Sequence, residues 1–180
     1  MAETERVTVL FDEASVARRV AEMAAEIATT LPEPFTVVGL LKGAFVFVAD
    51  LVRALDRAGR RPRVEFLQVS SYGLAQQSSG TVKVIGGMPS SVEGQNVLLV
   101  DDIQDTGRTI AFTKAMLEQN GAARVWTCAL LDKPSRRVQG GDADFTGFVI
   151  PDVFVVGYGI DYAERYRHLP FIGVVTTGPA

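Results

Sequence analysis

The residues best suited to chemistry lie in one segment, Val97-Leu-Leu-Val-Asp-Asp-Ile-Gln-Asp-Thr-Gly-Arg-Thr109. Its apolar run predicts a buried strand that ends in two acids, and its last residues predict the start of a helix. Amides at a helix start and threonine hydroxyls can donate hydrogen bonds to an anion, which the helix dipole also favours. A glycine lets the backbone approach a phosphate closely, and adjacent carboxylates can accept hydrogen bonds from the vicinal hydroxyls of a ribose. The segment therefore favours a site for a phosphorylated sugar.

Two interpretations without such a ligand stay open for this segment. It can be a strand, an acidic turn and a capped helix, since Asp and Thr are common N-caps. Val100-Asp101-Asp102 can also mimic the acidic phosphorylation pocket of a receiver domain, although the Thr-Gly-Arg-Thr helix start has no place there. The pattern is neither a P-loop nor a dinucleotide-binding fingerprint, because the sequence has no Gly-x4-Gly-Lys-Ser/Thr and no Gly-x-Gly-x-x-Gly that opens a helix here.

Five further segments resemble parts of the same protein family as this one. They are Gly39-Leu-Leu-Lys-Gly-Ala-Phe-Val-Phe-Val-Ala-Asp-Leu-Val52, Ser70-Ser-Tyr-Gly73, Leu131-Asp-Lys-Pro-Ser-Arg136, Pro151-Asp-Val-Phe-Val-Val-Gly-Tyr-Gly-Ile-Asp-Tyr162 and Tyr166-Arg167. The segment from Val97 closely resembles the phosphoribosyl-diphosphate motif of type I phosphoribosyltransferases. The others resemble the first loop, the mobile catalytic loop, the base-selecting segment and the C-terminal segment of hypoxanthine-guanine phosphoribosyltransferases. The matches run in the family's order from about residue 7 to about residue 175.

The resemblance implies that two loops hold phosphoribosyl diphosphate. Asp101 and Asp102 would hold the ribose hydroxyls, and Asp105 would be the general base that takes a proton from the purine. The residues implied to bind the phosphoribosyl group are Asp101, Asp102, Asp105, Thr106, Gly107, Arg108 and Thr109. The residues implied to bind pyrophosphate are Leu41, Lys42, Gly43 and Arg167. In this family a cis peptide bond often precedes the lysine.

A purine site is implied by the same resemblance. Phe154 would stack on one face of the purine and Ile103 would lie against the other, although either residue alone is more often part of a core. Lys133 would donate a hydrogen bond to the 6-oxo oxygen, although a lone lysine is more often solvated. The backbone carbonyls of Val155 and Asp161 would accept hydrogen bonds from the purine.

A magnesium site and a lid complete what the resemblance implies. The Asp161 side chain, together with Asp101 and Asp102, would bind Mg²⁺, a hard cation that prefers carboxylate oxygens. Ser71 and Tyr72 would begin a loop that closes over the substrates and excludes water. The Ser-, Gly- and Gln-rich composition that follows them is typical of a mobile loop.

The implied reaction is the displacement of pyrophosphate from the ribose C1 by a purine ring nitrogen, a step of purine salvage. Hypoxanthine would give IMP and guanine would give GMP. An enzyme for xanthine or another base is a close alternative, and a regulatory protein that kept the fold to control RNA or genes is a more distant one. Two positions depart from the family: Asp101 stands where glutamate is common, and Gln104 stands where some members have an aliphatic residue.

Strands and helices alternate along most of the chain and must position these residues. Asp12 as N-cap and helical apolar spacing predict a helix over residues 12–30, and similar patterns predict helices over 44–58 and 109–119. Apolar runs predict strands at 36–41, 64–69, 81–85, 96–100, 125–131, 153–156 and 171–175. The alternation predicts an α/β fold with a mainly parallel sheet flanked by helices, to which the resemblance adds the type I phosphoribosyltransferase fold with a small hood. Ligands of such sheets bind outside the carboxyl ends of the strands.

The bulk properties fit one domain over residues 1–180. Of its 180 residues 47% are hydrophobic and 22% are charged, as in ordinary globular proteins, and its net charge of -3 argues against binding nucleic acid. The longest apolar stretch contains Lys42 and Asp50, which makes it a poor membrane span. Cys128 is the only cysteine, so no intrachain disulfide can form, and we expect a buried thiol in a cytoplasmic enzyme. The expected partners are phosphoribosyl diphosphate, a 6-oxopurine base and further copies of the chain, in a dimer or tetramer.

Overall fold

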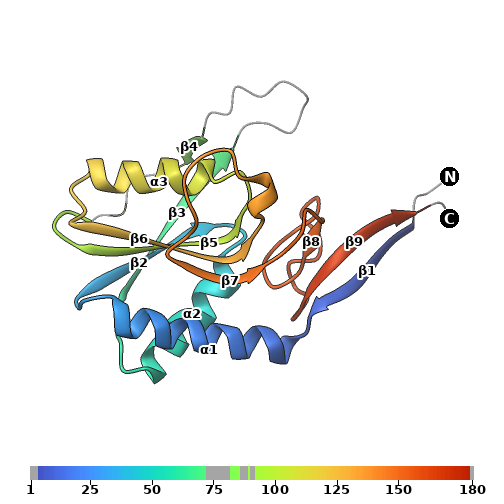
Figure 1. Ribbon diagram of the computed structural model, residues 1–180, viewed down its shortest axis with the longest axis horizontal. Coiled ribbons are helices and arrows are strands. Elements are labelled where there is room, and N and C mark those ends of the chain that lie inside the picture. The colour runs from blue at the N-terminus through green and yellow to red at the C-terminus, as the bar shows by residue number, and fades with distance from the viewer. Residues whose placement is uncertain (1–3, 72–81, 86–88, 90–91, 179–180) are drawn as a thin grey trace.

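The main body is a six-stranded sheet between helices, seen in a computed structural model that describes residues 4–71, 82–85, 89 and 92–178 (Figure 1). Its strands, in spatial order, are β4 (Val82–Ile85), β3 (Arg63–Ser71), β2 (Phe35–Leu41), β5 (Asn96–Gln104), β6 (Arg124–Asp132) and β7 (Phe145–Val149). All neighbours are parallel except β3 and β4. The helices α1 (Glu13–Thr30) and α2 (Phe45–Arg57) cover one face, and α3 (Arg108–Gln119) covers the other. This arrangement confirms the predicted α/β fold.

A second, smaller sheet stands beside the main one (Figure 1). It joins β1 (Thr4–Phe11), β9 (Ile172–Gly178) and β8 (Val155–Val156) in antiparallel order, so the two ends of the chain pair with each other. This small sheet corresponds to the expected hood. That residues 1–180 form one domain stays a prediction, and no helix among the described residues is long and apolar enough to cross a membrane.

Burial on both faces explains the apolar central strands. In β5, Leu98 and Val100 belong to the core beneath α1 and α2, whereas Val97 and Leu99 belong to the core beneath α3. Successive side chains of a strand point to opposite faces, so a strand covered on both sides needs apolar residues at every position. The expected thiol of Cys128 is buried in the same way, and burial raises the pKa of this group.

The helices begin and end close to where the sequence predicts. Asp12 caps α1, because its carboxylate accepts a hydrogen bond from the Ser15 amide at 2.8 Å. The strand predicted at 96–100 continues to Gln104, because the backbone of β5 keeps pairing with β6 as far as Gln104 opposite Asp132. The predicted acidic turn is therefore wrong at Asp101 and Asp102, which lie within the strand.

Other differences lie at the sheet edges. The strand predicted at 153–156 is reduced to Val155–Val156, since β9 pairs with these two residues alone. The sequence analysis missed β1 and β7. Both are edge strands of their sheets, and edge strands with one paired side and exposed positions lack the continuous apolar run that marks a buried strand.

Candidate active site

The candidate site residues gather at the carboxyl ends of β2, β5 and β6. Because parallel strands end at the same edge of a sheet, the loops after these three strands become neighbours. Lys42 and Gly43 follow β2, Asp105 follows β5, and Lys133 follows β6. The amide of Lys133 donates to the carbonyl of Gln104 at 3.0 Å, which joins the loops after β5 and β6 directly.

Two adjacent carboxyl groups lie near the end of β5. Asp101 is buried and its Oδ1 accepts from the Asp102 amide at 2.9 Å, while Asp102 Oδ1 accepts from the Ile103 amide at 2.9 Å. Burial, followed by the charge of Asp102, raises the pKa of Asp101 well above its usual range. The pair can therefore offer oxygen atoms that accept hydrogen bonds from hydroxyl groups.

The loop after β2 fits tightly against this pair. A Cβ on Gly43 would lie 1.9 Å from Oδ2 of Asp102, and a Cβ on Gly159 would lie 2.5 Å from the carbonyl oxygen of Gly43. The Leu41–Lys42 peptide bond is cis, as the resemblance implied. The Lys42 ammonium lies 3.2 Å from a carboxylate oxygen of Glu164. Three segments distant in sequence thus contact one another at Gly43.

The loop after β5 encloses a small hollow of about 50 Å³. It is lined by Asp101, Ile103, Gln104, Asp105, Thr106, Gly107, Thr109 and Ile110. Gly107 is the N-cap of α3 with φ of 80°, and a glycine has no side chain that could accept from the first amides of the helix. Since the first amides of a helix have no intrahelical acceptor, this end of α3 is suited to an anion.

Asp105 does not cap the helix, which was the simpler explanation of its position. Its Oδ1 instead accepts a hydrogen bond from Nε of Arg136 at 3.1 Å. The pairing raises the pKa of the Arg136 guanidinium. Asp105 is held beside the hollow by a residue of the base-selecting segment.

Lys133 is buried rather than solvated. Its side chain donates from Nζ to the carbonyl of Val153 at 2.7 Å, next to Phe154. The Phe154 ring is 70% exposed and meets Tyr162 edge-on with ring centroids 6.0 Å apart. A large apolar ring left this exposed beside a buried cation suits a flat ligand that stacks on it.

Asp161 and Arg167 form a partly buried pair. Nη2 of Arg167 lies 2.9 Å from Oδ1 of Asp161, and Nη1 donates to the Gly159 carbonyl at 2.8 Å. The other carboxylate oxygen of Asp161 accepts from the Glu164 amide at 2.7 Å. Three residues that are close together in the sequence have positive φ: Ala163 (51°), Glu164 (63°) and Tyr166 (74°). Residues other than glycine rarely adopt such angles, and they do so mostly where the surrounding structure requires it.

Comparison with known proteins assigns the chain to a family. The family described as phosphoribosyl transferase domain matches residues 7–163. The chain belongs to this family. It is 47% identical over 173 residues to the hypoxanthine-guanine phosphoribosyltransferase of Aquifex aeolicus, covering 95% of this chain and 96% of the relative. It is 44% identical over 168 residues to that of Bacillus subtilis, covering 93% and 92%.

Solved structures give the same assignment. A Trypanosoma cruzi hypoxanthine phosphoribosyl transferase superimposes with a TM-score of 0.87 at 38% identity, covering 94% of this chain and 91% of that one. A Bacillus anthracis hypoxanthine-guanine phosphoribosyltransferase superimposes with a TM-score of 0.86 at 36% identity, covering 96% and 100%. The phosphoribosyltransferase fold inferred from the sequence is confirmed.

The structure brings most of the predicted site residues of this phosphoribosyltransferase together, and it adds two further residues to them. Arg136 and Arg137 contact the loop after β5, although the sequence analysis gave them no role; their place next to Lys133 in the base-selecting segment was the available signal. Gln104, which departs from the family, is buried; its Nε2 donates to the Gly141 carbonyl at 2.9 Å, whereas its Oε1 has no hydrogen-bond partner. Ser71 ends β3, and Tyr72, the other predicted lid residue, lies outside the described residues.

We expect Gly43→Ala to impair the phosphoribosyltransferase reaction severely, because the added Cβ would displace the Asp102 carboxylate. A displacement of about 1 Å in a catalytic group can reduce turnover by about 100-fold. The measurement is kcat/KM for phosphoribosyl diphosphate. Gly141→Ala is the matched control, since no atom lies within 4 Å of the Cβ it would add. Equal effects of the two substitutions would show that the contact with Asp102 is unimportant.

Proposed function

We propose that this phosphoribosyltransferase transfers the 5-phosphoribosyl group from phosphoribosyl diphosphate to hypoxanthine and guanine, giving IMP or GMP and pyrophosphate. The observation that carries the proposal is the position of Lys133. Its buried ammonium donates to the carbonyl of Val153, the residue before Phe154, and its backbone is hydrogen-bonded to the loop that surrounds the proposed anion-binding hollow. A donor for a 6-oxo group and a site for a phosphate are thereby held side by side. The names of the relatives support the same substrates.

The residues of the chain divide the work of the reaction. Thr106, Gly107 and Thr109 bind the 5′-phosphate at the start of α3, which also positions Asp105 beside the ribose C1. Asp105 accepts the proton that the purine loses as its other ring nitrogen attacks. Donors at Lys42 and Arg167 stabilise the negative charge that develops on the leaving pyrophosphate.

Magnesium fits the acidic residues of the site. Mg²⁺ is usually bound through one or two carboxylates plus substrate phosphate oxygens, and the described residues contain no cluster of three acidic, histidine or cysteine side chains that would hold it alone. One oxygen of Asp161 accepts a hydrogen bond from the Glu164 amide and the other is paired with Arg167, and a carboxylate has further lone pairs to offer a cation. Asp161, Asp101 and Asp102 do not form one such cluster, so they would hold magnesium together with oxygens of the substrate, where it would neutralise the charge of the pyrophosphate.

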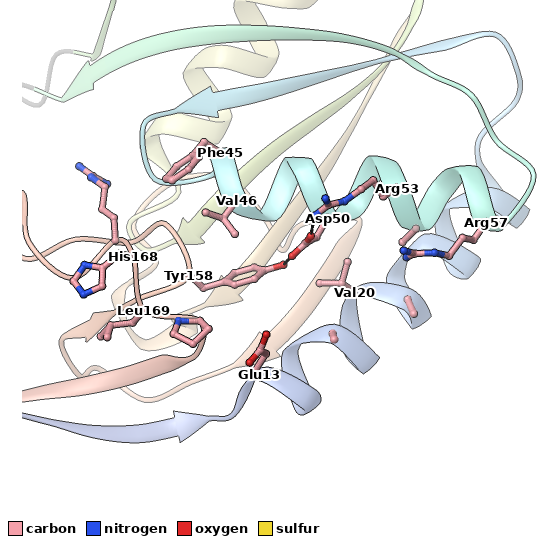
Figure 2. A pocket seen from close by; sticks show the side chains of 15 residues that line it. Glu13, Val20, Phe45, Val46, Asp50, Arg53, Arg57, Tyr158, His168 and Leu169 are labelled. Carbon is pink, nitrogen blue, oxygen red and sulfur yellow. Dashed lines mark hydrogen bonds and ion pairs between the residues drawn. The ribbon is translucent and has the colours of Figure 1, made fainter.

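A homo-oligomer in the cytoplasm completes the proposal. Figure 2 shows the pocket that we propose as the contact surface for a second copy. A hollow of about 700 Å³ lies between α1, α2 and the C-terminal segment, and it shares Arg167 with the candidate site. Apolar side chains such as Phe45, which is 43% exposed, mix there with charges of both signs such as Glu13 and Arg57. In a two-fold dimer the same surface patch of each copy faces the other. A patch that carries positive and negative side chains can therefore pair with its own copy.

Light scattering tests this assembly. The chain has a mass of 19.4 kDa, and a dimer or tetramer predicts two or four times this value. Ala21→Glu would place a charge in the hollow and is expected to shift the mass toward one chain, whereas Arg61→Glu, at a side chain that is 88% exposed and does not line the hollow, should leave it unchanged. A wild-type mass of one chain would contradict the proposed assembly.

Product formation from phosphoribosyl diphosphate with a panel of bases tests the proposed function. We expect turnover with hypoxanthine and guanine, and rates that are lower by about 10- to 100-fold or more with adenine, because an amino group does not accept the further hydrogen bond that the buried Lys133 ammonium offers. Replacing magnesium with a chelator should stop product formation. Comparable rates with adenine would contradict the assignment, and efficient use of xanthine would extend it to a further base.

Asp105→Asn separates a general base from a merely structural residue. Asparagine keeps the oxygen that accepts from Arg136 but cannot take a proton, so single-turnover rates should fall by about 100- to 10,000-fold. Affinity for phosphoribosyl diphosphate, measured separately, should stay nearly unchanged. Asp142→Asn, at an exposed neighbouring acid, is the control. Near-normal turnover of Asp105→Asn would show that the carboxylate is not the base.

A further inference from the structure

The arginine next to Arg136 binds the backbone of the phosphate loop. Nη1 of Arg137 donates to the carbonyl of Asp105 at 2.6 Å and to the carbonyl of Gln104 at 3.2 Å. Its Nη2 pairs with the carboxylate of Asp132, the last residue of β6. The side chain of Arg137 is 13% exposed and that of Asp132 is 6% exposed, so this ion pair is largely shielded from water.

The rest of the same segment binds the loop through its own amides. The amide of Lys133 donates to the Gln104 carbonyl at 3.0 Å, and the amides of Val138 and Gln139 both donate to the Thr106 carbonyl at 3.1 Å. Three successive loop carbonyls, those of residues 104, 105 and 106, are therefore directed toward residues 133–139. None of residues 133–139 lines the hollow at the start of α3.

The direction of these carbonyls decides where the loop amides point. A trans peptide unit is planar, and its C=O and N–H point in opposite directions. When the carbonyls of residues 104–106 face residues 133–139, the amides of Asp105, Thr106 and Gly107 face away from them. These amides are the donors that a phosphate in the hollow would need.

The packing of the two segments leaves little freedom for the loop to turn. A Cβ on Gly107 would lie 2.0 Å from the carbonyl oxygen of Gln139 and 2.9 Å from Cδ of Arg137. A guanidinium group has donors in a fixed planar fork, so it can hold a carboxylate and two carbonyls at once. A lysine ammonium at this position has a single nitrogen and cannot span Asp132 and both carbonyls in the same geometry.

We propose that Arg137 is a positioning residue for the 5′-phosphate. It acts through the loop rather than on the substrate: it holds the carbonyls of Gln104 and Asp105 and thereby fixes the amides that bind the phosphate. The inference rests on the proposed function, because it needs the hollow to bind the phosphate of a nucleotide. Arg137 also links the phosphate loop to the segment that carries Lys133. One guanidinium thereby positions both the residues that bind the phosphate and the segment that binds the purine.

The test compares IMP with inosine, which differ in the 5′-phosphate alone. Dissociation constants for both are measured by calorimetry on the wild-type chain and on Arg137→Lys. We expect the ratio of the inosine to the IMP constant to fall by about 10-fold or more in the variant, as when a charge-assisted hydrogen bond is lost. The inosine constant itself should change little. Arg61→Lys, at a side chain that is 88% exposed, is the matched control and should leave the ratio unchanged.

A purely structural role for Arg137 gives a different result. It would lower the melting temperature while leaving the ratio of the two constants at its wild-type value, and this outcome would overturn the proposal. The double variant Arg137→Met with Asp132→Asn removes the buried charge pair altogether, so it retains no unpaired buried charge; the proposal requires its ratio to fall as well. A wild-type chain that binds IMP no better than inosine would instead contradict the proposed function.

Discussion

The pairing of β5 with β6 is the constraint on which the rest of the site depends. The two strands stay hydrogen-bonded beyond their apolar cores, as far as Gln104 opposite Asp132. Their carboxyl ends therefore stop side by side, and the next residues of each chain segment, Asp105 and Lys133, become neighbours. If the pairing ended at Val100, where the apolar run ends, the strands would not carry the acidic loop as far as the base-selecting segment. The chemistry of the site thus begins with backbone hydrogen bonds rather than with side chains.

Buried or partly buried cations of the site are matched with oxygen atoms of the protein. Lys133 donates to the Val153 carbonyl, Arg137 to two loop carbonyls, and Arg167 to the Gly159 carbonyl. Taking a charge out of water costs free energy unless hydrogen bonds satisfy it. These contacts offset part of that cost, although Nε of Arg137 is buried without a partner, and they also fix the direction in which each cation points. A site organised in this way needs little rearrangement to stabilise the charge that develops during phosphoribosyl transfer.

Glycine at two positions lets separate parts of the chain meet at this site. Gly43 lies against Asp102, and Gly107 lies against the backbone of Gln139, at distances where a methyl group would overlap its neighbours. The first contact joins the loop after β2 to β5, and the second joins the start of α3 to the segment after β6. Side chains could not make these approaches, since even a Cβ is too large. The site is consequently assembled from close backbone contacts between four segments.

The sequence by itself determined the α/β class, the helices and the buried strands, because apolar periodicity reflects which faces are covered. It also predicts that Asp101 to Thr109 bind a phosphate, because donors and acceptors at a strand-to-helix turn lie close together along the chain. The tertiary structure decided the rest. The continuation of β5 to Gln104 depends on a partner strand, and the edge strands β1 and β7 carry no continuous apolar run. The contacts of Arg136 with Asp105 and of Arg137 with the loop carbonyls join residues about 30 positions apart. Local sequence cannot distinguish these arginines from solvated ones, since their burial and their partners exist only after β6 has packed beside β5.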